Sequence, residues 1–474
     1  MSEKNNGKKA LRAGLGYTIG NVFCKGLSFI SAFIFARLMS LQDYGIYNTF
    51  ASYVAILAIV IGFALHVTIR NAKIDYADRL DEYCSSVSLL TVINSLILFI
   101  AAFVFREQLG ALLSLPSQLV AIIVIESFAN AVMSFYNDYL AVHFQSKKYL
   151  VISLIYAVGG TLLSVLLICT VCSDVRYFGR ALGTAIPLLI IAIYILCTFY
   201  RTSLPRVRKE YWKYGLRISL PIIPHGLSQI ILAQFDRIMI KMSVGDTMAG
   251  MYSFANNIGM IFQIITNSMD TAWTPWFFER MEAKDYKAIR KASSLYLAFV
   301  SILAVGMLLI SPELIVIMGG ETYRDSRYVV LPLLLSVFFA FMYTLPSNIE
   351  YYYKKTQIIA FGTMGAAVLN IILNSIFVPM YGYVAAAYTT VFCYVCYFVV
   401  HMIISTRIQG SMIFDLRVII GCAVAVTAAM FICLWLINEV AVRMTVVAIG
   451  ILAMLVVVYL KRDMVLPLVR NLKK

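Results

Sequence analysis

The sequence predicts an all-α polytopic membrane protein with about fourteen transmembrane helices. Of its 474 residues, 61% are hydrophobic and 13% are charged, and this charged fraction is about half of that found in a soluble domain. Apolar segments long enough to cross a bilayer recur along the whole chain. We place these segments at residues 13–36, 45–68, 83–105, 118–140, 149–172, 181–200, 214–235, 248–270, 289–311, 328–350, 357–379, 383–405, 415–437 and 444–460.

Lysine and arginine are distributed unevenly between the predicted loops. With the N-terminus in the cytoplasm, 28 of the 39 basic residues fall in cytoplasmic segments or at the cytoplasmic edges of spans, and 9 fall in external loops. Basic residues favour the cytoplasmic side of a membrane, so this count predicts that both termini are cytoplasmic. The same rule explains the net charge of +15 without a nucleic-acid partner. The polar start MSEKNNGKK and the long first apolar segment do not match a cleavable signal peptide.

A repeat divides most of the chain into two units of six helices. Gly45 and Tyr47 at the start of the second span recur as Gly250 and Tyr252 at the start of the eighth, 205 residues later. A Lys-Lys pair at 147–148 recurs at 354–355. Because six is even, the two units have the same orientation, which predicts a parallel pseudo-two-fold repeat.

The repeat predicts four parts of the chain. Residues 1–200 form an N-terminal six-helix lobe, 201–213 a basic cytoplasmic linker, and 214–410 a C-terminal six-helix lobe. Residues 411–474 hold two extra transmembrane helices and a cytoplasmic tail, and these have no counterpart in the repeat. Two symmetric lobes favour a transporter with a central cavity over an enzyme.

The segment 213–252 is the most informative stretch of the sequence. It is apolar enough to cross a membrane, yet it carries polar residues and two prolines, namely Arg217, His225, Gln229, Asp236, Pro221 and Pro224. Polar groups inside a membrane helix usually face a bundle interior or a watery cavity. At about 100° per residue, His225, Gln229 and Asp236 share one narrow face. We interpret this helix as the wall of a polar cavity.

Polar stripes in three further spans extend the predicted cavity. The cavity-lining candidates, with those just named, are Asn21, Asn130, His225, Gln229, Asn256, Gln263 and Asn267. The ionisable candidates are Glu126, Asp270 and Asp236. Any single stripe is equally compatible with hydrogen bonding between helices. Four such helices in one chain favour a solvated cavity.

Lys25 lies about midway across the first predicted span. An unpaired charge at this depth costs about 3 kcal/mol even on the most lenient insertion scale. Two interpretations stay open. Lys25 either binds an anion in the cavity or pairs with a carboxylate such as Glu126 to hold helices together.

No sequence pattern indicates a metal site or covalent catalysis. The CxxC pairs at 169–172 and 393–396 lie in apolar spans without a nearby His or acidic partner, which favours packing over metal binding or redox chemistry. The four histidines form no ligand motif, and there is no Gly-rich phosphate loop. We therefore expect a transporter without a cofactor.

Three motifs resemble those of a known family. The runs SLPIIPHGLSQIILAQFDRIMI, AGMYSFANNIG and ARLMSLQDYGIYN resemble the Wzx-type polysaccharide flippases of the MOP (MATE-like) exporter superfamily. The resemblance covers nearly the whole chain, with two six-helix lobes followed by two helices. It implies a substrate made of an oligosaccharide on undecaprenyl pyrophosphate, which moves from the inner to the outer leaflet of the cytoplasmic membrane.

The resemblance also implies which residues contact the substrate. Inward-facing basic residues would bind the pyrophosphate, and the candidates are Lys25 and Arg217, with Arg37, Arg70, Arg237 and Lys241 nearer the openings. A headgroup with two phosphates needs cations beside amides and hydroxyls. The family pattern gives no coupling residue, so the assignment of Glu126 or Asp270 to a proton or sodium gradient is our own hypothesis.

The implied partners are lipid-linked oligosaccharide and membrane lipid, with a polysaccharide polymerase and an initiating glycosyltransferase acting on the same glycan. We expect a monomer in the inner membrane of a bacterium. One alternative is a MATE-like drug or cation antiporter, which should concentrate acidic groups in its cavity. A flippase for the peptidoglycan precursor is a close variant. A membrane-embedded glycan polymerase is a third alternative, disfavoured because the longest predicted external loop, 312–328, is short.

Overall fold

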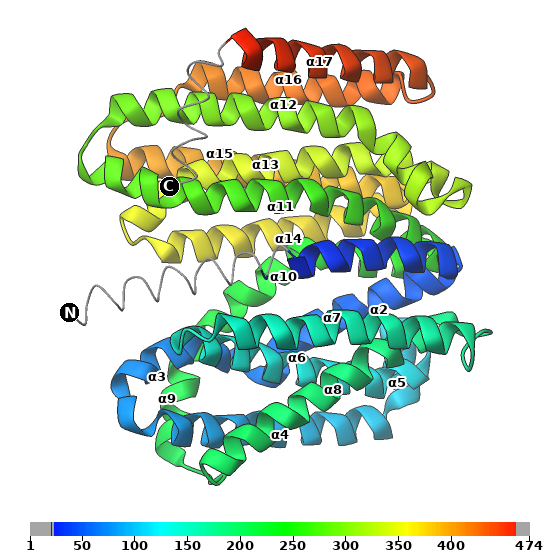
Figure 1. The fold of residues 1–474 in the computed structure, drawn as a ribbon, viewed down its shortest axis with the longest axis vertical. Coiled ribbons are helices and arrows are strands. Elements are labelled where there is room, and N and C mark those ends of the chain that lie inside the picture. Colours follow the sequence, from blue (N-terminus) through cyan, green and yellow to red (C-terminus); the bar gives the residue numbers. More distant parts are fainter. Residues whose placement is uncertain (1–19, 21–22, 461–474) are drawn as a thin grey trace.

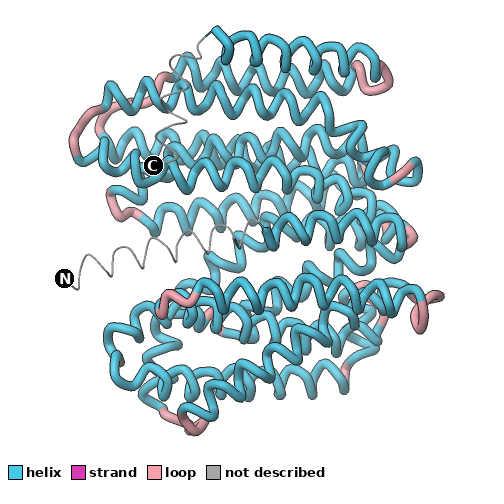
Figure 2. The backbone as a smooth tube through the Cα atoms, in the orientation of Figure 1, coloured by secondary structure: helices cyan, strands magenta, loops and turns pink. Residues whose placement is uncertain are grey.

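The computed structural model describes residues 20 and 23–460, and the side chains of these residues except 451 and 453–460. Within this part of the chain every regular element is a helix, which confirms the predicted all-α class. The long helices lie side by side, and the loops gather at their two ends (Figure 2).

The helices match all fourteen predicted spans. Eleven helical segments of the described chain are long and apolar enough to cross a membrane. They are α2 (Leu41–Gly62), α4 (Leu80–Val104), α6 (Ser117–Val142), α7 (Ser146–Cys169), α8 (Arg176–Thr202), the pair α9 (Lys209–Ser219) and α10 (Ile223–Val244), α12 (Tyr286–Gly319), α13 (Arg327–Tyr352), α14 (Thr356–Tyr381), α15 (Tyr383–Gln409) and α16 (Leu416–Trp435). The other three predicted spans correspond to a helix over residues 23–38, to α11 (Asp246–Glu282) and to α17 (Val440–Leu460).

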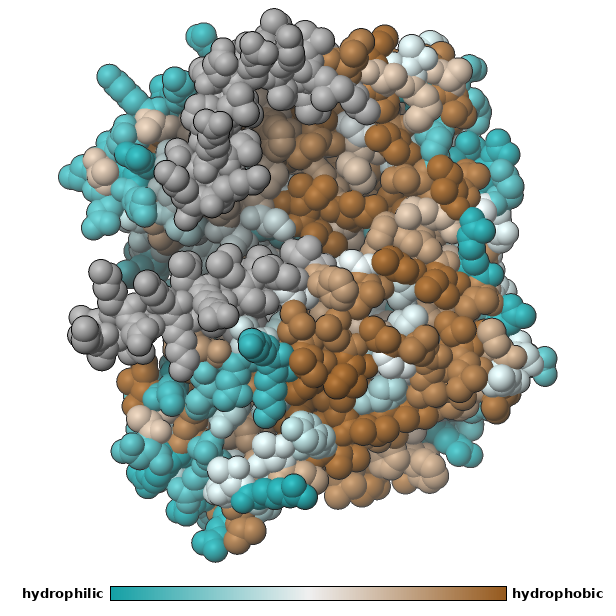
Figure 3. Space-filling view, viewed as in Figure 1, coloured by the Kyte–Doolittle hydropathy of each residue, from teal (hydrophilic) through white to brown (hydrophobic). Residues whose placement is uncertain are grey.

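Shorter helices connect the spans. They are the 3-10 helices η1 (Leu65–Thr68), η2 (Ala77–Arg79), η3 (Leu220–Ile222) and η4 (Glu321–Ser326), and the α-helices α3 (Ile69–Asp75) and α5 (Arg106–Leu113). The surface has the polarity of a membrane protein. Apolar side chains cover a broad band across the face in Figure 3, and hydrophilic residues gather toward the ends of the helices. A bilayer accommodates such a band because its hydrocarbon cannot solvate polar groups.

Two groups of helices lie one above the other in Figure 1. We call the helices from 23–38 to α8 the N-lobe and those from α10 to α15 the C-lobe. Helices α16 and α17 lie against the outer side of the C-lobe, beside α12 (Figure 1). The far end is where α2 and α11 begin, and the linker end is where residues 203–208 connect α8 to α9. The division of the chain into domains stays a prediction.

The two lobes meet where α2 crosses α11 at the far end. A Cβ atom on Gly45 would overlap the main-chain oxygen of Asp246 and lie 2.9 Å from the nitrogen of Gly250. A Cβ atom on Gly250 would overlap the main-chain oxygen of Leu41. Leu41 and Asp246 are themselves 205 residues apart, as are the two glycines. The contact is therefore reciprocal, as a two-fold axis through the crossing requires.

Helix α9 packs against the N-lobe rather than the C-lobe. The indole Nε1 of Trp212 donates to the main-chain oxygen of Ser86 at 2.8 Å, and the hydroxyl of Tyr211 donates to Glu82 at 3.0 Å. The chain then passes through η3, which contains Pro221, before α10 begins. Proline removes a helical hydrogen bond and interrupts the helix. The chain thus crosses from the N-lobe to the C-lobe at residues 220–222, just beyond the predicted linker.

One predicted span ends earlier than expected. The sequence placed the second span at 45–68, but α2 ends at Gly62. Phe63 and Ala64 have positive φ angles of 48° and 50°, which turn the chain out of the helix into η1. His66, expected inside the span, therefore lies beyond the end of α2.

Candidate functional site

A polar cavity of about 520 Å³ lies inside the N-lobe. Its walls come from α2, α4, α6, α7 and α8, and Ile230 of α10 reaches it from the C-lobe. The side of α2 that faces it carries small residues one or two turns apart, namely Ala51, Ala55, Ala58 and Gly62. These small side chains leave the space open because they extend little from the helix.

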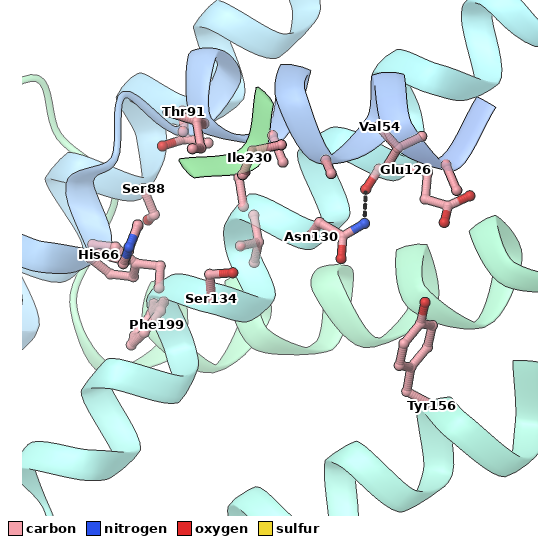
Figure 4. A pocket seen from close by; sticks show the side chains of 18 of the residues that line it. Val54, His66, Ser88, Thr91, Glu126, Asn130, Ser134, Tyr156, Phe199 and Ile230 are labelled. Carbon is pink, nitrogen blue, oxygen red and sulfur yellow. Dashed lines mark hydrogen bonds between the residues drawn. The ribbon is translucent and has the colours of Figure 1, made fainter. Parts of the chain in front are cut away.

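Polar side chains line the cavity at both ends. In Figure 4, His66, Ser88 and Thr91 lie at one end, and Glu126 and Tyr156 at the other. Asn130 and Ser134 lie between the two ends (Figure 4). Such a lining offers hydrogen bonds along the whole length of a polar ligand.

A second cavity, of about 320 Å³, shares Asn130, Ser134 and Tyr156 with the first. It is bounded by the helix over residues 23–38 together with α6, α7 and α8. Arg180 and Thr184 of α8 line it. The hydroxyl of Thr184 donates to the carboxylate of Glu126 at 3.0 Å, so residues of both cavities are joined by a hydrogen bond.

Arg180 is the charged residue of this site that the sequence did not identify. We placed the sixth span at 181–200, which assigned Arg180 to an external loop. Helix α8 instead begins at Arg176, so Arg180 lies one turn inside the helix. Gly183 packs so closely that an added Cβ would lie 2.6 Å from the main-chain nitrogen of Ser164, but it already lay inside the predicted span and did not mark the earlier helix start. Such close helix packing is typical of buried membrane helices rather than loops.

The predicted cavity-lining residues fall in different places. Asn130 lines both N-lobe cavities, and its side chain donates to the main-chain oxygen of Glu126 at 3.0 Å. Gln263 and Asn267 border a small cavity of about 40 Å³ between α11 and α13. His225 contacts Gln229 one turn away on α10, outside these cavities. Asn256 is partly exposed on α11. Asn21 lies outside the described residues.

The predicted phosphate-binding residues do not form one cluster. Lys25 and Arg217 are exposed, on the helix over 23–38 and on α9. In the described part of the chain, Lys25 forms no ion pair with Glu126. Arg70, also exposed, lies 3.5 Å from Asp138.

The other three basic candidates lie toward the far end. Arg37 donates from Nη2 to the main-chain oxygen of Ile317 at 2.6 Å, and so joins the helix over 23–38 to α12. Arg237 is buried and donates to Gln234 at 2.6 Å. Lys241 is buried in an ion pair with Asp246. The phosphate-binding role of all six residues stays a prediction.

The three acidic candidates have different surroundings. Glu126 is 5% exposed and borders the N-lobe cavity. Asp236 is 4% exposed and accepts hydrogen bonds inside the C-lobe from Asn374 at 2.6 Å and Thr390 at 2.8 Å. Asp270 is partly buried, and its Oδ1 atom has no hydrogen-bond partner among the described residues. Glu126 alone of the three lines a large cavity.

The arrangement suits reversible binding of a polar ligand. Among the described residues, no three His, Cys, Asp or Glu side chains gather into a metal site. The N-lobe cavities instead combine hydroxyl, amide, carboxylate and guanidinium groups with apolar side chains in the same walls. Pockets of this size and mixed lining bind small polar molecules or headgroups.

Comparison with known families agrees with this architecture. Residues 10–281 match the model of a family described as polysaccharide biosynthesis protein. This match covers more than half of the chain. The chain belongs to this family.

Two relatives and a solved structure are similar to this chain over most of its length. A protein of Haemophilus influenzae, named Lsg locus putative protein 1, is 22% identical over 370 residues, which are 74% of this chain and 87% of that protein. A probable low-salt glycan biosynthesis flippase, Agl15 of Haloferax volcanii, is 20% identical over 398 residues, 82% of each chain. The structure of the lipid II flippase MurJ superposes with a TM-score of 0.74 at 16% identity, covering 95% of this chain and 99% of that one.

A second solved structure has a similar fold. An inward-facing multidrug resistance MATE family transporter of the MOP superfamily superposes with a TM-score of 0.58 at 15% identity. It covers 81% of this chain and 96% of that one. The family match confirms the family predicted from the sequence motifs, and both superpositions agree with the fold predicted for a transporter.

Proposed function

We propose that the protein is a flippase for undecaprenyl-pyrophosphate-linked oligosaccharide, the repeat unit of an O-antigen, capsule or exopolysaccharide. The observation that carries the proposal is the polar cavity of the N-lobe, next to the crossing of the two lobes. A glycan headgroup needs such a passage because a bilayer cannot solvate its hydroxyls. Membership of a polysaccharide biosynthesis family and similarity to a protein named as a glycan flippase support it.

Movement by alternating access fits the way in which the lobes touch. At the far end, the crossing of α2 with α11 and the bonds from Arg37 to α12 hold the lobes together. Rocking of one lobe against the other exposes the site to each side in turn. The break in the helix at 220–222 offers a hinge, and the polyprenyl tail stays in the lipid throughout.

An ion gradient gives this movement its direction. Glu126 is the first candidate for a protonatable or sodium-binding group because it borders the cavity while its carboxylate is nearly buried. Asp270 and Asp236 are the other two. Glu126→Gln keeps the shape of the side chain and removes its charge. This variant should lose the dependence of transport on the pH or sodium gradient, and unchanged dependence would remove Glu126 from the role.

The location follows from the substrate. We place the protein as a monomer in the cytoplasmic membrane of a bacterium, with both termini and the linker end in the cytoplasm. The class of reaction that supplies the substrate is transfer of the first sugar phosphate to a lipid carrier by an initiating glycosyltransferase. A polymerase on the external side of the membrane consumes the translocated repeat unit.

Translocation in proteoliposomes tests the proposal. Vesicles containing the purified protein are loaded with undecaprenyl-pyrophosphate oligosaccharide, and the fraction open to an external glycosidase is followed over time. We expect the accessible fraction to rise faster than in protein-free vesicles. Equal rates with and without protein, combined with efflux of an organic cation from the same vesicles, would favour the drug antiporter that the fold also permits.

A further inference from the structure

The smaller N-lobe cavity contains an arginine whose partners are all uncharged. Nη1 of Arg180 donates to the hydroxyl of Ser164 at 2.9 Å, and Nη2 donates to that of Ser31 at 3.3 Å. The guanidinium carbon lies 3.7 Å from the ring centroid of Phe35 and 5.0 Å from that of Tyr47. Two rings and two hydroxyls thus hold the guanidinium at the wall of the cavity.

The charge of Arg180 has no balancing carboxylate at contact distance. No ion pair within 4.0 Å includes it in the described chain. Glu126, the nearby acid, takes its hydrogen bond from Thr184 instead. Nη1 and Nη2 each donate to one hydroxyl and have a second N–H, and the buried Nε atom has no hydrogen-bond partner among the described residues. The guanidinium therefore retains both charge and donor capacity for a ligand.

The buried cations of the described chain have different kinds of partner. Lys241 is paired with Asp246, and Arg443 with Glu313. Arg237 and Arg327 are also buried, but they donate to neutral groups and have no ion pair in the described chain. Arg180 likewise has no ion pair there, and its guanidinium lines a cavity of about 320 Å³, where its charge can meet a ligand.

We propose that Arg180, with the hydroxyls of Ser31 and Thr161, forms an oxyanion subsite that binds a phosphate or carboxylate group of the transported headgroup. This inference rests on the proposed flippase function. It assigns anion binding to a residue outside the set of basic candidates that the sequence predicted.

The chemistry of the subsite specifies the class of ligand. A guanidinium offers a planar fork of donors that fits a phosphate or a carboxylate, and its bonds to such groups are stronger than those between neutral partners. The hydroxyl of Ser31 accepts from Arg180 and can donate to a remaining oxygen of the ligand. The hydroxyl of Thr161 already lies 3.3 Å from that of Ser31. Both the lipid pyrophosphate and an acidic sugar carry a suitable oxyanion.

Binding of defined lipids to the purified full-length protein tests the subsite. The probes are undecaprenyl pyrophosphate without sugars, neutral undecaprenol, and a lipid-linked oligosaccharide that contains a uronic acid. Arg180→Gln should weaken binding of an anionic probe by about tenfold or more, the effect of losing charge-assisted hydrogen bonds. Its binding of undecaprenol should not change. Arg180→Lys, which keeps the charge and loses the fork, should lie between Gln and wild type.

The two anionic probes identify the source of the oxyanion. Weaker binding of bare undecaprenyl pyrophosphate assigns the subsite to the phosphates. Unchanged binding of that probe with weaker binding of the uronic acid probe assigns it to the sugar carboxylate. A matched control is Arg106→Gln, which removes an exposed arginine that also lies over a phenylalanine, at 5.7 Å from the ring centroid of Phe103.

Equal affinity of wild type, Arg180→Gln and Arg180→Lys for both anionic probes would overturn the subsite. If Arg180→Gln does not fold, the affinities of Arg180→Lys and wild type for the anionic probes test the subsite by themselves. Failure of the proposed function gives a different result, because wild type would then move no lipid-linked glycan in vesicles. If wild type moves the glycan but the substitutions at Arg180 do not change the affinity for the anionic probes, only the subsite is contradicted.

Discussion

Replacement of Gly45 by alanine should open the far end of the transporter. At this position α2 and α11 cross so closely that an added Cβ overlaps the main-chain oxygen of Asp246 and lies 2.9 Å from the nitrogen of Gly250. Both neighbours are main-chain atoms of a long helix, so neither can move away alone. The two helices must separate, and with them the two lobes.

The size of the effect follows from the overlap. Inserting a methyl group into a packed contact of this kind costs about 1–3 kcal/mol. Because the strain exists only while the far end is closed, the ratio of closed to open molecules should fall by about 5- to 150-fold. Gly250→Ala should act in the same direction, since its Cβ would overlap the main-chain oxygen of Leu41.

Distances between spin labels measure this shift directly. Suitable exposed positions at the far end are Asp174 in the N-lobe and Glu321 in the C-lobe, labelled after the nine native cysteines have been replaced. We expect a larger fraction of molecules with a long distance between the two labels in Gly45→Ala than in wild type. The control is Gly159→Ala in α7, where an added Cβ meets nothing within 4 Å. If Gly45→Ala and wild type have the same distance distribution, the crossing does not hold the lobes closed.

Three further predictions concern stability and the linker. Glu350→Leu should lower the unfolding temperature in detergent by removing the 2.8 Å bond to buried His401, at a cost of about 1–3 kcal/mol, and an unchanged midpoint would contradict this. Trp212→Phe removes the bond that fastens α9 to the N-lobe, so trypsin should cleave residues 203–208 faster than in wild type. Burial lowers the pKa of His66 below its ordinary value of 6.5. Because the folded state binds a proton at His66 less readily than the unfolded state, the free energy of unfolding should fall as the pH drops below about 6.5. In His66→Asn this fall with pH should be less steep than in wild type, and an equal slope would contradict the prediction.

The arrangement of spans could be predicted from the sequence because the signal is repeated along each helix. Some twenty apolar residues are needed to cross a bilayer, and a few wrong residues at an end do not hide the pattern. The same tolerance explains the errors at helix ends, because a few residues more or less do not alter the pattern. The end of α2 depends on left-handed conformations at Phe63 and Ala64, which no local pattern in this apolar stretch indicates.

The site was harder to predict because it depends on which faces meet. His225, Gln229 and Asp236 do share a face of α10, yet Asp236 is buried against α14 and α15 while Gln229 is exposed. Periodicity places residues on a face but does not identify the neighbour of that face. Arg180 was missed for a related reason, since an error of five residues at a helix start moved it from the site to a loop.

The central claim is that the headgroup passes through the N-lobe cavity. Ala58 faces this cavity from α2, so Ala58→Trp places a large ring inside it. Leu162→Trp adds a ring of the same kind on the lipid-facing side of α7, where Leu162 is 64% exposed. The measurement is translocation of lipid-linked oligosaccharide in proteoliposomes by both variants, after each has been shown to fold. We predict that Ala58→Trp loses transport and Leu162→Trp keeps it. Transport at the wild-type rate by Ala58→Trp would contradict the account.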